Sequence, residues 1–303
     1  MRTALMVILL AVVAGAQATP LHKAIALGRE TVYLSPDLSS SKVGGLQPGE
    51  QIGVQATGRG FTQIFSGVSG WIPDHDYVQL SAPNAASVLL GAAVKQERLG
   101  EQNNDDTATA AAVRLFLDIY NYLPESPRAA EALYRGAALR WETKISEEPL
   151  GTAPSNRLFP DDSLLHKVEN RYRNTPWAAQ AAFQLIIEHF TCGDWFQKPS
   201  CIGKEAKRYQ DYVKKYPSSP SAPEAAFDAL YRDGIAWTIY RRASIHQDAG
   251  KAAQFQQQVA LDAVQLQQQY PHSDWAARGA YLAYLVAHNS PLPLPASTPL
   301  GGP

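Results

Sequence analysis

The sequence predicts a small all-β barrel followed by an all-α solenoid of about four helix pairs. Two observations lead to this fold class. Residues 21–80 carry short apolar bursts separated by Gly, Pro and Ser turns, which is typical of a small domain built from strands. After Ser81-Ala82-Pro83 the composition shifts to Ala, Leu, Gln and Tyr, and four similar junctions then recur, which is typical of stacked helical repeats.

Within residues 21–80, three segments have strand length and partly alternating apolar residues, at 31–34, 51–55 and 61–65. Turn-forming sequences such as Ser35-Pro36-Asp37 separate them. Several short strands in one small segment predict a closed barrel, because an open sheet of this size leaves exposed edges.

The order of landmarks in this segment resembles the bacterial SH3 domain. The matching runs are Val32 to Glu50 and Gly70-Trp71-Ile72, the latter followed by Tyr77-Val78. The resemblance implies an SH3-like barrel that serves as a targeting or binding module in exported proteins, some of which recognise cell-wall peptides.

Three aromatic residues of this segment carry specific expectations. Phe61 begins the run that stands where the family often has a tryptophan. Tyr33 and Phe61 are the candidate binding residues. Trp71 is expected in the core, because a Gly-Trp strand must fill a small barrel.

The four helical junctions begin at Ser126, Thr175, Ala222 and Ser273, which lie 49, 47 and 51 residues apart. The hydroxyl residues Ser126, Thr175 and Ser273 can cap the start of a helix. Proline residues stop the preceding helix at three of the four breaks. Each repeat is therefore expected to hold one helix, a short break and a second, alanine-rich helix.

The run from Tyr122 to Tyr134, together with Lys215-Tyr216-Pro217-Ser218-Ser219, resembles the tetratricopeptide-like repeats of bacterial envelope proteins. Outer-membrane assembly lipoproteins and cell-division coordinator proteins carry such repeats. The resemblance implies a TPR-like domain over residues 84–289. Its period exceeds the standard 34 residues, and longer helices or a loop at 147–160 would supply the extra length.

Two further segments of this half are not expected to form a functional site. The glutamines around 256–268 are expected to form an ordinary solvated helix face, because an apolar stripe of helical period runs through them. Residues 290–303 hold the run Pro291 to Pro295 and are predicted to be a disordered, proline-rich tail with no core to join.

The first residues are typical of a secretory signal. Arg2 precedes an apolar run, and Ala16-Gln17-Ala18 forms a cleavage site, so residues 1–18 are expected to be removed. The alternative is a membrane anchor, but the uncharged run is shorter than the roughly 20 residues that span a bilayer. No cysteine lies near the cleavage site. We therefore expect a periplasmic or secreted bacterial protein that is not a lipoprotein and keeps no integral membrane segment.

Both cysteines, Cys192 and Cys201, bracket one short segment. In an oxidising compartment, a disulfide between them is the first expectation. The alternative is a metal site that adds His189 and Asp194, although the paired Cys-x-x-Cys spacing of structural zinc sites is absent.

Two large apolar residues, Trp195 and Phe196, lie between the cysteines. They are expected either to pack between neighbouring repeats or to contact a partner, the first being the commoner use of loop aromatics in such arrays.

The composition limits the classes of function. The 303 residues are 45% hydrophobic and 18% charged, which suits about two folded domains. Lysine and arginine number 27 against 28 acidic residues, so the net charge is -1. This balance provides no broad positive surface, and we expect no nucleic-acid partner.

No motif for catalysis is found. The sequence lacks a phosphate-binding loop, a His-Glu-x-x-His motif and a Gly-x-Ser-x-Gly elbow. The densest polar run, Asp74-His75-Asp76, is favoured as a solvated loop over a metal site. We therefore expect no catalytic residues, no cofactor and no metal.

The leading hypothesis is an exported, non-enzymatic adaptor. Its SH3-like module would bind cell wall or another envelope component, and its helical array would bind a protein partner in its groove. The alternative is a cell-wall hydrolase, or an accessory subunit of one, with unrecognised catalytic residues.

Overall fold

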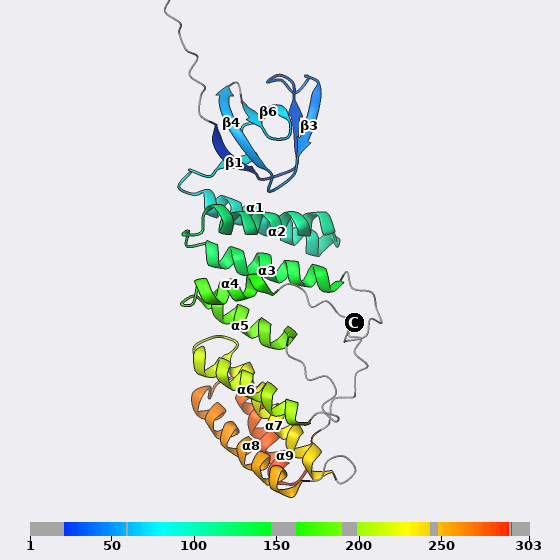
Figure 1. Cartoon of the computed structure of the whole chain (residues 1–303), viewed down its shortest axis with the longest axis vertical. Helices are drawn as coiled ribbons and strands as arrows, with labels where there is room; N and C mark the ends of the chain where they lie inside the picture. Colours follow the sequence, from blue (N-terminus) through cyan, green and yellow to red (C-terminus); the bar gives the residue numbers. More distant parts are fainter. Residues whose placement is uncertain are drawn as a thin grey trace, which may run out of the picture. The chain divides into compact units, whose positions relative to one another are not determined.

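A computed structural model of the chain describes residues 21–58, 60–146, 162–189, 199–242, 248–290 and 292 (Figure 1). An antiparallel β region precedes an α-helical region, as the sequence predicts. The chain divides into two compact units between Ala92 and Ala93, within the first helix. None of the helices in the described ranges combines the length and apolar character needed to span a membrane. The predicted signal at 1–18 and the tail beyond Leu292 lie outside the described residues.

The strands are β1 (His22–Ala26), β2 (Glu30–Tyr33), β3 (Lys42–Leu46), β4 (Gln51–Gly58), β5 (Phe61–Phe65), β6 (Ser69–Pro73) and β7 (Tyr77–Gln79). The helices are α1 (Ala85–Asn103), α2 (Asp106–Tyr122), α3 (Ala129–Ser146), α4 (Ser163–Arg171), α5 (Pro176–His189), α6 (Pro199–Lys215), α7 (Ala222–Arg241), α8 (Ala249–Gln269) and α9 (Asp274–Ala287).

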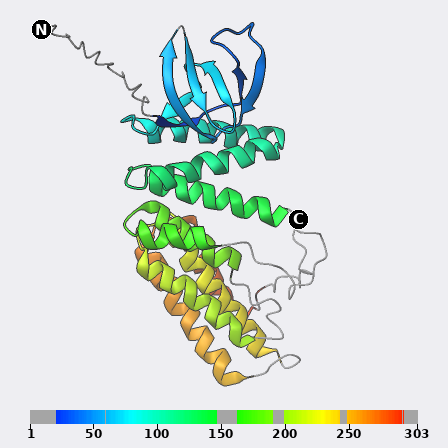
Figure 2. The ribbon, with the colours of Figure 1, turned by 45° about the horizontal axis from the view of Figure 1, so that its top comes forward.

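The seven described strands form one antiparallel sheet in the order β3-β2-β6-β5-β4-β1-β7. Figure 2 shows that the sheet is strongly curled. Its ladder does not close, because β3 and β7 are outer strands that each pair on one side only among the described residues. The predicted closed barrel is therefore corrected to a curled sheet with two edges, one of which is kept short by the three-residue β7.

Aliphatic residues fill the inner face of this sheet. Buried and partly exposed residues alternate along β5, where Thr62 and Ile64 are buried and their neighbours are not. The core cluster consists of Ala24, Ala26, Val32, Leu46, Ile52, Val54, Ile64 and Ile72.

The four predicted junctions mark helix starts. Helices α3, α5, α7 and α9 begin at or within three residues of them. The side chains of Ser126, Thr175 and Ser273 each accept a hydrogen bond from a backbone N–H two or three residues later, at 3.2, 3.4 and 3.1 Å respectively. The predicted capping is thus confirmed at Thr175 and Ser273, whereas the Ser126 hydroxyl binds the N–H of Arg128 in the turn just before α3.

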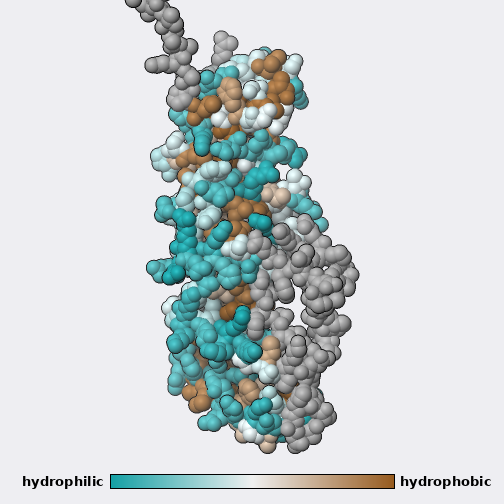
Figure 3. Space-filling view, in the orientation of Figure 1, coloured by the Kyte–Doolittle hydropathy of each residue, from teal (hydrophilic) through white to brown (hydrophobic). Residues whose placement is uncertain are grey.

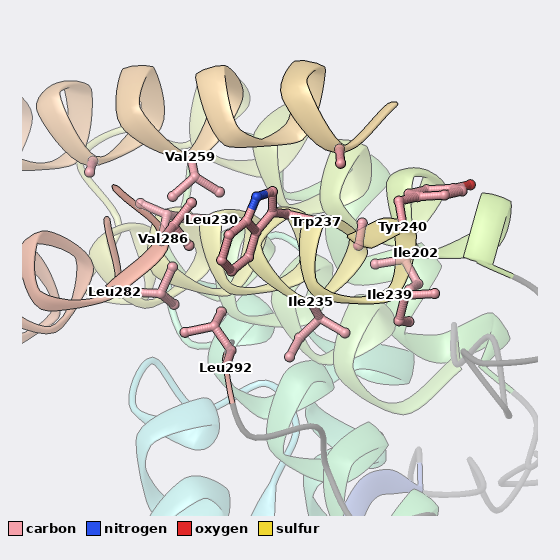
Figure 4. Close-up of a cluster of buried hydrophobic side chains, with 13 residues drawn as sticks. Ile202, Leu230, Ile235, Trp237, Ile239, Tyr240, Val259, Leu282, Val286 and Leu292 are labelled. Carbon is pink, nitrogen blue, oxygen red and sulfur yellow. The ribbon is translucent and has the colours of Figure 1, made fainter. Parts of the chain in front are cut away.

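The last helices enclose a core around Trp237 (Figure 4). Trp237 is 1% exposed and lies among aliphatic side chains of α7, α8 and α9. Leu292 joins the same core, contrary to the prediction that the tail has none to join: it is 3% exposed, and its N–H donates to Thr238 Oγ1 at 3.3 Å. Glycine at 234 makes room for it, because a Cβ there would lie 2.6 Å from Leu292 Cδ1.

Candidate functional site

An aromatic surface lies on the outer face of the sheet. Tyr33 of β2, Trp71 of β6 and Gln63 of β5 are directly opposite one another across three neighbouring strands. The ring of Phe61 meets that of Tyr33 edge-on, with 6.4 Å between centroids. The aromatic side chains are half-buried, so each remains partly accessible. The two residues nominated from the sequence are therefore neighbours in space.

Trp71 belongs to this surface and not to the core, contrary to the prediction. Gly70 and Ile72 on either side of it are buried, and strand alternation then places Trp71 on the outer face. Glycine is needed at position 70, because a Cβ there would lie 2.6 Å from both Val32 Cγ1 and the carbonyl oxygen of Tyr33. The aliphatic core is complete without an indole, which leaves Trp71 beside Tyr33.

Two residues of the Asp74-His75-Asp76 run make contacts within the β unit. The Asp74 carboxylate accepts a hydrogen bond from the buried Thr62 hydroxyl, which also lies 3.1 Å from Tyr77 Oη. Asp76 lies beside Glu30, and burial together with Asp76 raises the pKa of Glu30 to about 7. Within the described residues, no group of three or more His, Cys, Asp or Glu residues is arranged to hold a metal ion.

A groove of about 570 Å³ lies between α6 and α8. Its floor is formed by the small residues Ala226 and Ala229 of α7. One stripe of α8 lines it, at spacings of four, three and four residues that keep side chains on one side of a helix. The stripe consists of Gln258, Asp262, Gln265 and Gln269.

Asp262 is held in place by three hydrogen-bond donors. Gln258 Nε2 donates to Oδ1 at 2.8 Å, and Gln210 Nε2 donates to Oδ2 at 3.4 Å. The third donor is the carboxyl group of Asp233, which is 3% exposed. Burial and the adjacent Asp262 raise the pKa of Asp233 to about 7, and burial raises the pKa of Asp262 as well, while its hydrogen bonds lower it.

A buried ion network joins α7 to α6 beside this groove. Arg232 Nε donates to Glu205 Oε2 at 2.9 Å, and Glu205 is only 2% exposed. The same guanidinium lies 3.5 Å from the Asp228 carboxylate and 4.3 Å from the centre of the Tyr209 ring. Burial raises the pKa of Tyr209 to about 12, which keeps its hydroxyl neutral. The network fixes the spacing of two of the three helices that form the groove.

A second groove, of about 470 Å³, lies between α2 and α3. Asp118 in its lining is 8% exposed, and its Oδ2 has no hydrogen-bond partner among the described residues. Burial raises the pKa of Asp118 to about 7 against the opposing charge of Arg114. Among the described residues, no hydrogen bond holds Asp118 Oδ2, whereas both oxygen atoms of Asp262 accept one.

Of the remaining predicted site residues, the structure describes one, Cys201. Cys201, in the first turn of α6, is disulfide-bonded. Cys192, Trp195 and Phe196 lie outside the described residues, so the Cys192–Cys201 pairing and the role of the two aromatic residues stay predictions.

Reasoning from the sequence missed the α6–α8 groove. Gln258, Gln265 and Gln269 belong to the glutamine-rich stretch that was interpreted as an ordinary solvated face. The one sequence signal for this groove is the helical spacing that places Asp262 and these three glutamines on one side of a helix. The sequence does not indicate that α6 packs opposite them.

The comparisons with known proteins identify no family. No protein-family model matches the chain, and no curated protein matches it. A solved chain titled "DHF58 filament" aligns at 14% identity with a TM-score of 0.23, covering 67% of this chain and 91% of that chain. A score this low carries no argument about fold or function.

Proposed function

We propose that this chain is an exported bacterial adaptor without enzymatic activity. Its helices form a TPR-like array of four helix pairs whose groove binds an envelope protein. The observation that carries the proposal is the groove between α6 and α8, which has a floor of alanine and polar side chains along one wall. A hollow of this size with convergent polar groups is typical of a ligand site.

The β unit contributes the second contact of the adaptor. It is an SH3-like module whose outer face, with Tyr33, Phe61 and Trp71, binds peptidoglycan. The support is the cluster of partly accessible aromatic rings, since flat apolar rings with polar edges suit both sugar rings and peptides. On the view in Figure 3, hydrophobic residues lie in separate patches among hydrophilic ones, as expected for a protein with limited binding surfaces.

The groove is tested with the full exported chain. Proteins captured from envelope extract are identified, purified and titrated against it by calorimetry. Ala226→Leu, which fills the floor of the groove, should weaken binding at least tenfold. Ala253→Leu on an exposed part of α8 is the matched control and should leave binding unchanged. Equal affinity of the wild type and Ala226→Leu for the purified partner would remove the groove from the function.

The aromatic surface is tested by co-sedimentation with purified peptidoglycan. The double variant Tyr33→Ala, Trp71→Ala should leave the protein in the supernatant, while Leu38→Ala, at a side chain that is 65% exposed, should sediment like the wild type. A wild-type protein that does not sediment would exclude the cell-wall role and leave the protein-binding role standing.

A further inference from the structure

Asp262 is an acidic residue for which the described part of the chain provides no cationic partner. Among the described residues it accepts hydrogen bonds from side-chain amides and a carboxyl group but forms no ion pair. The other acidic residue of the lining, Asp211, is paired with Lys207 at 3.0 Å. Asp262 is half-buried, so an ion pair formed there is screened less by water than one on an open surface.

The donors around Asp262 keep its charge oriented. Gln258 and Gln210 bind its two oxygen atoms, and its carboxyl group shares a hydrogen bond with that of the buried Asp233. A carboxylate that is fixed in this way loses little side-chain entropy when a cation binds, and charge-assisted hydrogen bonds are stronger than neutral ones.

The rest of the stripe is suited to a polypeptide backbone. Gln265 and Gln269 are exposed in the groove and follow Asp262 along α8. A side-chain amide offers both a donor and an acceptor, as a peptide group does. From Gln258 to Gln269 the helix rises about 16 Å, which corresponds to about five residues of extended chain.

We propose that the α6–α8 groove binds an extended segment of about five residues in a protein partner, with a lysine or arginine side chain of that segment paired to Asp262. This rests on the proposed function of the same groove and names the class of partner. The glutamines hold the backbone of the segment, and Asp262 selects its charge.

The experiment uses N-acetylated, C-amidated peptides Ala-Ala-X-Ala-Ala in which X is lysine, arginine, norleucine or glutamate. They are titrated into the full mature chain while the side-chain amide signals of Gln258, Gln265 and Gln269 are followed by NMR. The lysine and arginine peptides should bind at least tenfold more tightly than the norleucine and glutamate peptides. Asp262→Asn should abolish that preference, and Asp274→Asn, the matched control at an exposed carboxylate of α9 outside the groove lining, should retain it.

Equal binding of the lysine and norleucine peptides, or an unchanged preference in Asp262→Asn, would overturn the assignment. Absence of saturable binding by the lysine peptide up to about 10 mM would do the same, since a fixed ion pair with backbone contacts should exceed that affinity. These results are separate from failure of the proposed function. If Ala226→Leu weakens binding of the purified partner but Asp262→Asn does not, the partner binds the groove without charge selection by Asp262.

Discussion

Two arginines in the helical unit occupy equivalent places in the repeat but are buried to different extents. Arg135 of α3 follows Glu131-Ala132-Leu133-Tyr134, and Arg232 of α7 follows Asp228-Ala229-Leu230-Tyr231. Each lies close to the acidic residue four positions earlier, at 3.6 and 3.5 Å respectively. The same local motif therefore begins the same ion network in two helices.

The two networks differ in their long-range partners. Arg135 pairs with Glu97 of α1 and lies 5.2 Å from the Phe116 ring centre, whereas Arg232 pairs with Glu205 and lies against Tyr209. The side chains of Arg135 and Glu97 are 27% and 12% exposed, against 15% and 2% for the second pair. The shared motif thus sets the pairing of each arginine with the acidic residue four positions earlier. The surrounding helices set how deeply the network is buried, and burial increases the free energy lost when a charge is left without its partner.

Tyrosines show a related contrast between breaks in the array. Tyr172 Oη donates to the carbonyl oxygen of Pro124 at 3.0 Å, and Tyr270 Oη donates to that of Pro217 at 2.9 Å. Tyr216 directly follows α6 at the break between these two, yet among the described residues its buried hydroxyl makes no such hydrogen bond to the preceding break. The two tyrosine links thus lie within two blocks, α2–α5 and α6–α9, and among the described residues Tyr216 makes no equivalent link between the blocks.

The largest loss of stability is expected when the more buried arginine network is broken. Arg232→Met should lower the free energy of unfolding by about 3–5 kcal/mol, because Glu205 is left buried without its cation. Arg135→Met should lower it by about 1–2 kcal/mol, since Glu97 is more exposed. Urea denaturation followed by circular dichroism measures both. Equal losses would mean that burial does not distinguish the two networks.

A smaller effect is expected in the pH dependence of stability, through the buried acidic residues Asp118 and Asp233 of the two blocks. The pKa of each is raised to about 7 in the folded chain, so the folded state binds more protons than the unfolded state between about pH 4 and pH 7. Their contribution to stability is complete below about pH 4 and is lost as the pH rises through 7. The melting temperature should therefore be higher at pH 5 than at pH 8.

Asp118→Asn isolates this effect in the first block. It should raise the free energy of unfolding at pH 8 by about 1–3 kcal/mol and change it little at pH 5, because the amide carries no charge to bury. The exposed, ion-paired Asp211 provides the control: Asp211→Asn should leave the pH dependence unchanged. Thermal melts of the variants at pH 5 and pH 8 test this prediction. A stability gain of the same size at both pH values would exclude titration of Asp118 as the cause.

The smallest expected effects concern the tyrosine links. Tyr172→Phe and Tyr270→Phe should each cost about 0.5–1.5 kcal/mol, the net value of one hydrogen bond. Tyr216→Phe should be neutral or stabilising, since among the described residues its buried hydroxyl makes no hydrogen bond that links two breaks. Denaturant midpoints of the three variants test the contrast. A loss at Tyr216 as large as at the other two would show that the blocks are linked there as well.

Part of the candidate site could be predicted from sequence. The order of strands and turns was enough to nominate Tyr33 and Phe61, which lie in contact range. Trp71 was misplaced because a tryptophan is a common core residue, and only the burial of Gly70 and Ile72 reveals its direction. The Asp262 groove was missed altogether.

Local sequence is sufficient to predict the β-then-α order and the helix starts beside the capping residues Thr175 and Ser273. These features depend on neighbours within a few residues, through turn chemistry, capping and apolar period. Tertiary structure alone decided that the sheet keeps two edges, that Leu292 enters the core beside Gly234, and that Asp262 meets Gln210. These outcomes depend on which side chains face one another across about 50 residues of chain, and local pattern carries no information about that pairing.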